Sequence, residues 1–230
     1  FYLDSGPMAV TTELFPDGTG EDFKVESMAI RATYARSLTD RLKIGTSINY
    51  IRDKIWETGM QAVSYDIGSN FDTGIYGTIL GMSITNFGPE VEYAGEGLSV
   101  QVPDTIDVDE SLERITDKFP LPLIFRLGIE NELIGPSSAF IQNENHRLII
   151  SMDGIKPSDY IVYGSVGLEY GWQNIAFVRM GTHLNHDTAK MSFGAGVNLR
   201  LGRMALRVDY AYVDYDVLKQ TNQFAIGLEF

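Results

Sequence analysis

The feature of this sequence that most constrains its fold is a strict two-residue alternation, repeated in segments of about ten residues. Large apolar side chains take every second position, and charged or small residues lie between them. In MALRVDYAYVDY (204–215), the apolar set includes Leu206, Val208 and Tyr210. A period of two indicates a strand with two unlike faces. Because no helical period competes over most of the chain, the sequence predicts an all-β protein.

The length and chemistry of these segments distinguish two all-β classes. The pattern recurs in MSFGAGVNLRL (191–201), VGLEYGW (166–172), HRLIISMD (146–153) and TNQFAIGLEF (221–230). A soluble β-sandwich also alternates, but its strands are typically five or six residues long. Strands of about ten residues match the length that crosses a bilayer at a tilt. A polar lumen face opposite an apolar face with aromatic ends is typical of a transmembrane antiparallel up-and-down β-barrel, which we predict.

The connections between segments also predict a topology. Tight turns are expected at 38–43, 72–77, 172–175 and 201–203, and longer loops at 14–27, 89–119 and 184–190. The two groups fall on opposite ends of the strands, as periplasmic turns and extracellular loops do in outer-membrane barrels. Segment 133–146 is an exception, because it is long although it falls on the short-turn end. We have no physical account of that length.

By this count the chain forms about twelve strands, beginning with PMAVTTE (7–13), in a single domain that covers residues 1–230. The start of the sequence has neither a methionine nor a basic segment followed by an apolar one. We therefore expect a mature or shortened chain that lacks its signal peptide and an N-terminal hairpin.

Composition excludes several classes of function. The net charge of −13 argues against nucleic acid as a partner, because phosphates require a basic surface. The absence of cysteine excludes disulfides and thiolate metal sites. No G-x-S-x-G, Walker or H-E-x-x-H motif occurs, and the three histidines, His146, His183 and His186, lack a clear third ligand. We expect no enzymatic activity, no metal and no cofactor.

The charges on the polar face are the first group of candidate site residues. By alternation they point into the lumen: Arg31, Asp66, Arg126, Glu130, Arg147, Asp153, Glu169, Arg179, Arg207, Asp209 and Glu229. Burying an unpaired ion costs several kcal/mol. We therefore expect most of these residues to pair across strands, with a polar path or the orientation of a ligand as the alternative.

The segment from Pro89 to Phe119, which we call the acidic insert, is the second candidate. Residues 90–119 hold nine acidic residues against Arg114 and Lys118. Loops of this length are usually functional or disordered. Within the insert, DESLERITDKF (109–119) predicts a short helix with an apolar side that contacts a partner or covers the barrel mouth. That apolar side consists of Leu112, Ile115 and Phe119. The spacing of Asp104, Asp107 and Asp109 does not match a calcium-binding EF-hand loop.

The final segment is the third candidate. Its apolar positions are Phe224, Ile226, Leu228 and Phe230. An alternating last strand that ends on an aromatic residue resembles the signal that outer-membrane insertion machinery engages. We therefore expect that deleting Phe230 would prevent insertion.

Four stretches carry a resemblance to a known family. They are YARSLTDRLKIGTSINYI (34–51), FDTGIYGTILGMSITNFGPEVEY (71–93), KPSDYIVYGSVGLEYGWQNIAFVRMG (156–181) and LRVDYAYVDYDVLKQTNQFAIGLEF (206–230). In these stretches the chain resembles the PorV/PorQ family of bacterial outer-membrane proteins, which are relatives of the fatty-acid transporter FadL. The resemblance implies a barrel with fourteen strands in the complete chain. The acidic insert is longer than is typical of the family.

The resemblance also implies a function. Its best-known members serve type IX secretion, so we expect a non-enzymatic accessory or shuttle in protein secretion or surface assembly. The expected surroundings are outer-membrane lipid and a protein partner, which would be a translocon, a cargo or a surface assembly. One alternative is a FadL-like transporter of hydrophobic small molecules, which would contain an apolar pocket inside the barrel and a plug at its N-terminus. Another alternative is a structural membrane anchor for an extracellular assembly.

Overall fold

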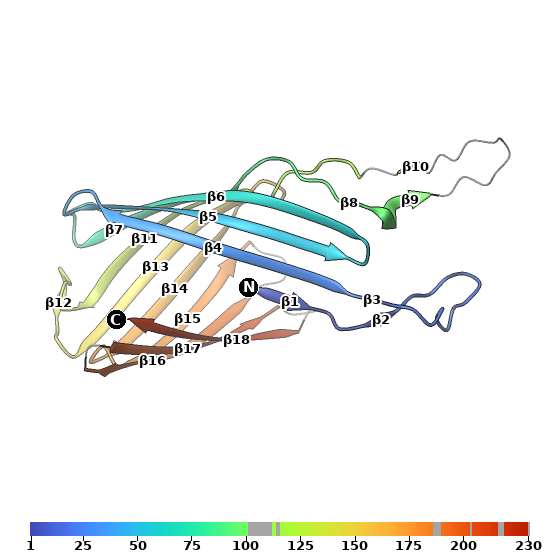
Figure 1. Cartoon of the computed structure of the whole chain (residues 1–230). Coiled ribbons are helices and arrows are strands. Elements are labelled where there is room, and N and C mark those ends of the chain that lie inside the picture. Colours follow the sequence, from blue (N-terminus) through green and yellow to red (C-terminus); the bar gives the residue numbers. More distant parts are fainter. Residues whose placement is uncertain (101–111, 114–115, 186–189, 203, 216–218, 230) are drawn as a thin grey trace. The chain divides into compact units, whose positions relative to one another are not determined.

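The computed structural model describes residues 1–100, 112–113, 116–185, 190–202, 204–215 and 219–229, and they are almost entirely β-structure (Figure 1). The long strands are β4 (Val25–Ser37), β5 (Leu42–Ile55), β6 (Thr58–Asp72), β7 (Thr78–Phe87), β11 (Ile124–Gly135), β13 (His146–Pro157), β14 (Tyr163–Trp172), β15 (Ala176–Leu184), β16 (Met191–Leu201), β17 (Met204–Asp214) and β18 (Gln220–Glu229). Their lengths run from 9 to 15 residues, so each is long enough to cross a bilayer at a tilt.

The main sheet contains 14 strands, and its hydrogen-bonded path follows chain order. The path runs β1-β4-β5-β6-β7-β11-β13-β14-β15-β16-β17-β18, where β1 is Tyr2–Asp4. Off this path, the short strands β8 (Ala94–Gly95) and β12 (Ile141–Gln142) pair with β6 and β11. The predicted all-β, antiparallel up-and-down fold is therefore confirmed. Over the described residues the path is open, with β1 and β18 as its two ends.

The first strand differs from the prediction. PMAVTTE does not join the main sheet. Its strand residues are those of β2 (Met8–Ala9), which pairs with β3 (Asp22–Phe23) in a separate two-stranded sheet. β1 takes the first position instead, alongside Glu26–Met28 of β4. Gly6 has a φ of 72°, and Pro7 follows it without a backbone donor, so the chain leaves the edge of β4 after Ser5, whose N–H still donates to the Val25 carbonyl.

The exposure of the two sheet faces is the reverse of that in a soluble sandwich. On β18, the apolar side chains of Phe224 and Ile226 are 77% and 75% exposed. On β6, every second residue from Met60 to Asp66 is buried, and this buried row ends with Ser64 and Asp66. We call the side that carries the charged and hydroxyl residues the polar face, and the opposite side the apolar face. In a sheet built for water, burial would favour the apolar face instead.

The chain divides into two compact units. Unit 1 comprises Phe1–Tyr34, Thr46–Ile67 and Thr85–Leu123, and unit 2 comprises Ala35–Gly45, Gly68–Ile84 and Ile124–Phe230. Unit 1 has a small apolar core of Met60, Ala62, Val91 and Leu121, against which Ile51 and Tyr93 pack. Met60 and Ala62 alternate with exposed residues of β6, so they share its polar face with Ser64. The base of the acidic insert therefore covers one end of that face.

The insert is a β-structure where it is described, and the predicted helix is wrong. Leu112–Glu113 forms β10, which pairs with β9 (Ser99–Val100), and Val91 bridges Phe119 closer to the base. A helix of about two turns is marginal in water, whereas two antiparallel arms satisfy each other's backbone groups. The short 3₁₀ turn η1 (Glu96–Leu98) joins β8 to β9. Within the described residues, no helix is long and apolar enough to cross a membrane.

Candidate functional site

An ion-pair cluster on the polar face of unit 2 is centred on Arg179. Its Nε donates to Glu169 Oε2 at 2.5 Å, and its Nη1 donates to Asp209 Oδ1 at 2.7 Å. Arg207 Nε lies 2.6 Å from Asp209 Oδ2. Glu169 stands directly opposite Arg179 in the register of β14 and β15, whereas Asp209 lies on β17, beyond β16. The cluster therefore links β14, β15 and β17 and spans the intervening strand β16.

Glycine on β16 makes this bridge possible. Gly194 lies opposite Arg179, and Gly196 lies opposite Asp209 on the same face. A Cβ on Gly196 would lie 2.4 Å from Asp209 Oδ1 and 3.1 Å from Arg179 Nη1. The Arg179 side chain therefore crosses β16 through the space that a side chain at position 196 would take.

We expect Gly196→Ala to break the Arg179–Asp209 contact and lower the free energy of unfolding by about 1–3 kcal/mol, the usual cost of leaving partly buried polar groups unsatisfied. Gly227→Ala is the matched control, because a Cβ at Gly227 meets only Arg207 Cβ at 3.9 Å. Urea unfolding in lipid vesicles measures the free energy of unfolding of both variants. Equal losses in the two variants would show that the crossing of β16 has no special role.

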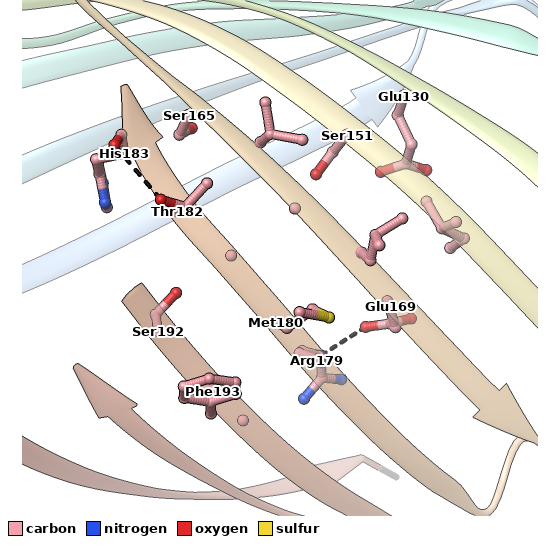
Figure 2. A pocket seen from close by; sticks show the side chains of 16 residues that line it. Glu130, Ser151, Ser165, Glu169, Arg179, Met180, Thr182, His183, Ser192 and Phe193 are labelled. Atoms are coloured by element: carbon pink, nitrogen blue, oxygen red, sulfur yellow. Dashed lines mark hydrogen bonds and ion pairs between the residues drawn. The ribbon is translucent and has the colours of Figure 1, made fainter. Parts of the chain in front are cut away.

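A pocket of about 400 Å³ lies beside this cluster in unit 2. Figure 2 shows Glu130, Ser151, Glu169 and Arg179 among its lining side chains, with Glu169 and Arg179 directed toward one another. Gly167 and Gly181 stand opposite one another on β14 and β15, and they contribute no side chains to the wall. This pocket combines carboxylates, hydroxyls and one paired guanidinium with apolar residues such as Met180 and Phe193, so its lining is mixed and does not by itself select a polar or an apolar ligand.

A second polar network lies on the polar face of unit 1. Arg31 Nε donates to Asn49 Oδ1 at 2.6 Å, and Arg31 Nη2 lies 3.4 Å from Asp66 Oδ2. Asn49 Nδ2 in turn donates to Ser64 Oγ, and Asp66 Oδ1 accepts the backbone N–H of Asn86 at 2.9 Å. Asp66 is only 8% exposed, so this network satisfies a buried carboxylate.

The other charges predicted for the lumen differ in their contacts. Arg147 Nε lies 2.8 Å from Glu132 Oε2, and Ser165 Oγ donates to Asp153 at 3.3 Å. Arg126 and Glu130 form no ion pair within the described residues. The backbone register places Glu229 opposite Ala205.

Three polar residues of these networks were missed by the sequence reasoning: Asn49, Ser64 and Glu132. Asn49 and Ser64 each lie between apolar neighbours, and Glu132 has the same parity as Glu130 on its strand. A search for all polar side chains on one face would therefore have found them.

The acidic insert is fixed at its base. The Tyr93 N–H donates to Thr116 Oγ1 at 2.9 Å, and that hydroxyl donates back to the Tyr93 carbonyl at 3.0 Å. The Tyr93 and Phe119 rings stack with centroids 5.9 Å apart. Burial, together with the Asp53 carboxylate, raises the pKa of Tyr93 above its ordinary value. Of the predicted contact residues, Leu112 belongs to β10, Phe119 lies in the Val91 bridge, and Ile115 lies outside the described residues.

The remaining predicted sites lie at the strand ends. Phe224, Ile226 and Leu228 of β18 are exposed on the apolar face, and the ring of Phe224 lies 5.0 Å from that of Tyr210. Phe230 and His186 lie outside the described residues. His146 Nδ1 lies 2.6 Å from the Tyr170 hydroxyl. No group of three or more potential metal ligands occurs among the residues that the structure describes.

Comparison of the sequence with family models and with curated proteins identifies no relative of this chain. The chain matches no family model, and a search of curated proteins finds no match either. The fold and the polar-face networks therefore define the class by themselves: an all-β protein built on a long-stranded, antiparallel up-and-down sheet.

Proposed function

We propose that this chain is a non-enzymatic β-barrel of the bacterial outer membrane. The observation that carries the proposal is the distribution of polarity over the sheet. Ion pairs and hydroxyls cluster on one face, while the opposite face exposes residues such as Val178, Phe224 and Ile226. In water such a surface would drive association. In lipid it is the outer face of a barrel, and the ion pairs fill a polar lumen.

The residues on the outward face of β5 indicate where the lipid-facing band ends. Ile44 and Ile48 are exposed on this face, and Arg52 and Lys54 follow on the same side toward the insert end of the strand. Charged side chains on the lipid face are tolerated near the interfaces but not at the bilayer centre. The β5–β6 turn and the base of the insert then lie beyond the hydrocarbon region.

We further propose that the protein acts as an accessory in protein secretion or surface assembly, with the acidic insert as its contact with a partner. Three observations support this role: the resemblance to the PorV/PorQ family, the length of the insert, and its fixed base. The base holds the arms in place through the Val91–Phe119 bridge and the β6–β8 pairing. A recognition loop needs such an anchor, because an unanchored loop loses more conformational entropy on binding.

Excision of residues 101–111 tests this role, because it removes the part of the sequence between β9 and β10 and keeps the anchored base. Joined by a short glycine linker, the variant should still show a heat-modifiable barrel in the outer membrane but lose its partner on purification from native membranes. Excision of 96–117 should have the same effect on the partner. If the partner still co-purifies with both variants, the insert is not the contact and the proposed role fails.

The second candidate, a transporter of hydrophobic molecules, is favoured by one observation: an apolar pocket in unit 1. That pocket lies at the β5–β6 turn and the insert rather than inside a barrel. Uptake of labelled hydrophobic compounds into cells with and without the protein distinguishes it from an accessory. A third possibility, an anchor for an extracellular assembly, predicts partner binding without secretion. Secretion assays in a deletion strain separate that outcome from the accessory role.

A further inference from the structure

The apolar pocket of unit 1, which we call the loop pocket, has a volume of about 560 Å³. Its lining includes Phe23 of β3, Ile55 and Trp56 at the β5–β6 turn, and Tyr93 and Leu98 of the insert. Ligand sites in proteins are typically pockets of about 300–1,000 Å³ lined mainly by apolar and aromatic side chains. The loop pocket has both properties.

The walls of the loop pocket are fixed by backbone contacts. The Trp56 N–H donates to the Lys24 carbonyl at 3.0 Å, which joins the turn to the segment after β3. The two hydrogen bonds between Tyr93 and Thr116 hold the opposite wall. The insert also pairs with β6 through Thr58 and Gly95. A pocket held in this way is largely formed before a ligand arrives.

Three aromatic side chains from three separate segments line the pocket: Phe23, Trp56 and Tyr93. Trp56 has a φ of 56° in a two-residue connection, a position where glycine is usual. A bulky residue in this conformation is strained, and such strain often marks a functional position. The faces of aromatic rings attract cations, and the indole ring does so most strongly.

The charges around the loop pocket also favour a cation. Asp53 shares the polar face of β5 with Ile55. Its carboxylate is one of the groups that raise the pKa of Tyr93. Glu57 directly follows Trp56 in the turn. Arg52 and Lys54 border the same adjoining space as Asp53 and Glu57, but they alternate with Asp53 along β5 and do not line the loop pocket.

The one basic residue next to Phe23 is also engaged. Lys24 Nζ lies 4.0 Å from Asp4 Oδ2, at the edge of the sheet. Asp53 and Glu57 line an adjoining space that shares Thr58 with the loop pocket, so a carboxylate ligand would approach their negative charges, and among the described residues no basic side chain lines the loop pocket.

We propose that the loop pocket binds an organic cation with an apolar body, such as an ammonium group attached to an aromatic ring. The apolar body fills the space between Ile55 and Leu98, and the ammonium group lies among the aromatic rings near Asp53. The loop pocket shares Tyr93 and Leu98 with the acidic insert, so it borders the proposed partner contact, but the ligand proposal does not depend on the membrane assignment.

The chain provides its own reporter for this test, because it contains two tryptophans, Trp56 and Trp172. In a Trp172→Phe background, fluorescence comes from Trp56 in the pocket. Benzyltrimethylammonium is the probe, and phenylacetate and benzyl alcohol are its anionic and neutral counterparts. In a non-ionic sugar detergent, we expect a saturable change with the cation at an affinity about tenfold or more above that of either counterpart.

Variants separate charge recognition from damage to the pocket. Asp53→Asn should weaken binding of the cation about tenfold while phenylacetate binds no more weakly, and Asp53→Glu should restore cation binding. Asp40→Asn, an exposed acid in the β4–β5 turn, is the control and should change nothing. Equal binding of all three probes, no saturable binding of any, or unchanged cation binding in Asp53→Asn would overturn the proposal.

Discussion

Replacing Val208 with arginine is expected to lower the free energy of unfolding in lipid by roughly 2–4 kcal/mol, the cost of an arginine on the lipid face near the bilayer midplane. Val208 lies in the middle of β17, and its side chain is 39% exposed on the apolar face between Val197 and Ile226. If that face contacts hydrocarbon, the guanidinium has no water within easy reach.

Ala205→Arg is the matched variant on the same strand, because Ala205 lies on the polar face opposite Arg200 and Glu229. We expect its cost to be smaller than that of Val208→Arg. Urea unfolding of both variants in vesicles gives the comparison. Equal costs would mean that the two faces meet similar surroundings and that the assignment of the lipid face is wrong.

The second large effect is expected at the base of the insert. Leu121 is 6% exposed and belongs to the core with Met60, Ala62 and Val91. Leucine-to-alanine changes in cores cost about 2–5 kcal/mol. We expect Leu121→Ala to loosen the insert from β6, so that trypsin cleaves at Arg114 or Lys118 roughly thirtyfold or more faster than in the parent chain.

Leu14→Ala is the control for this experiment, because Leu14 lies in the same unit and is 85% exposed. Its cleavage rate should match that of the parent chain. If Leu121→Ala is also cleaved at the parent rate, the apolar core does not hold the insert, and the anchored base loses its main support.

The long strands and their faces could be predicted because they depend on local alternation. Arg31, Asp66, Glu169 and Asp209 all lie on the face that alternation assigns to them. The Arg179–Asp209 contact could not be predicted from adjacent strands alone. It spans β16 and depends on the absence of a side chain at Gly196.

The insert shows a different limit of the sequence reasoning. The apolar spacing of Leu112 and Phe119 fits a helix as well as a strand, and the partners that decide between them, Ser99–Val100 and Val91, lie about 12 to 28 residues away along the chain. The prediction that PMAVTTE forms the first strand of the main sheet failed for a related reason. PMAVTTE alternates, but Gly6 and Pro7 direct the chain away from β4 before it, and β1 is too short to produce a periodic signal.

The central claim is that the apolar face of the sheet contacts lipid and the polar face does not. Because the chain has no cysteine, single cysteines can carry spin labels without background. Labels at Phe193 and Val197, on the apolar face of β16, and at Ser192 and Asn198, on its polar face, are compared in reconstituted bilayers by their accessibility to oxygen and to a water-soluble nickel complex. We predict that labels at Phe193 and Val197 are more accessible to oxygen than to the nickel complex. Labels at Ser192 and Asn198 should be more accessible to the nickel complex, or protected from both reagents. The same preference for the nickel complex at all four positions would contradict a membrane-spanning sheet.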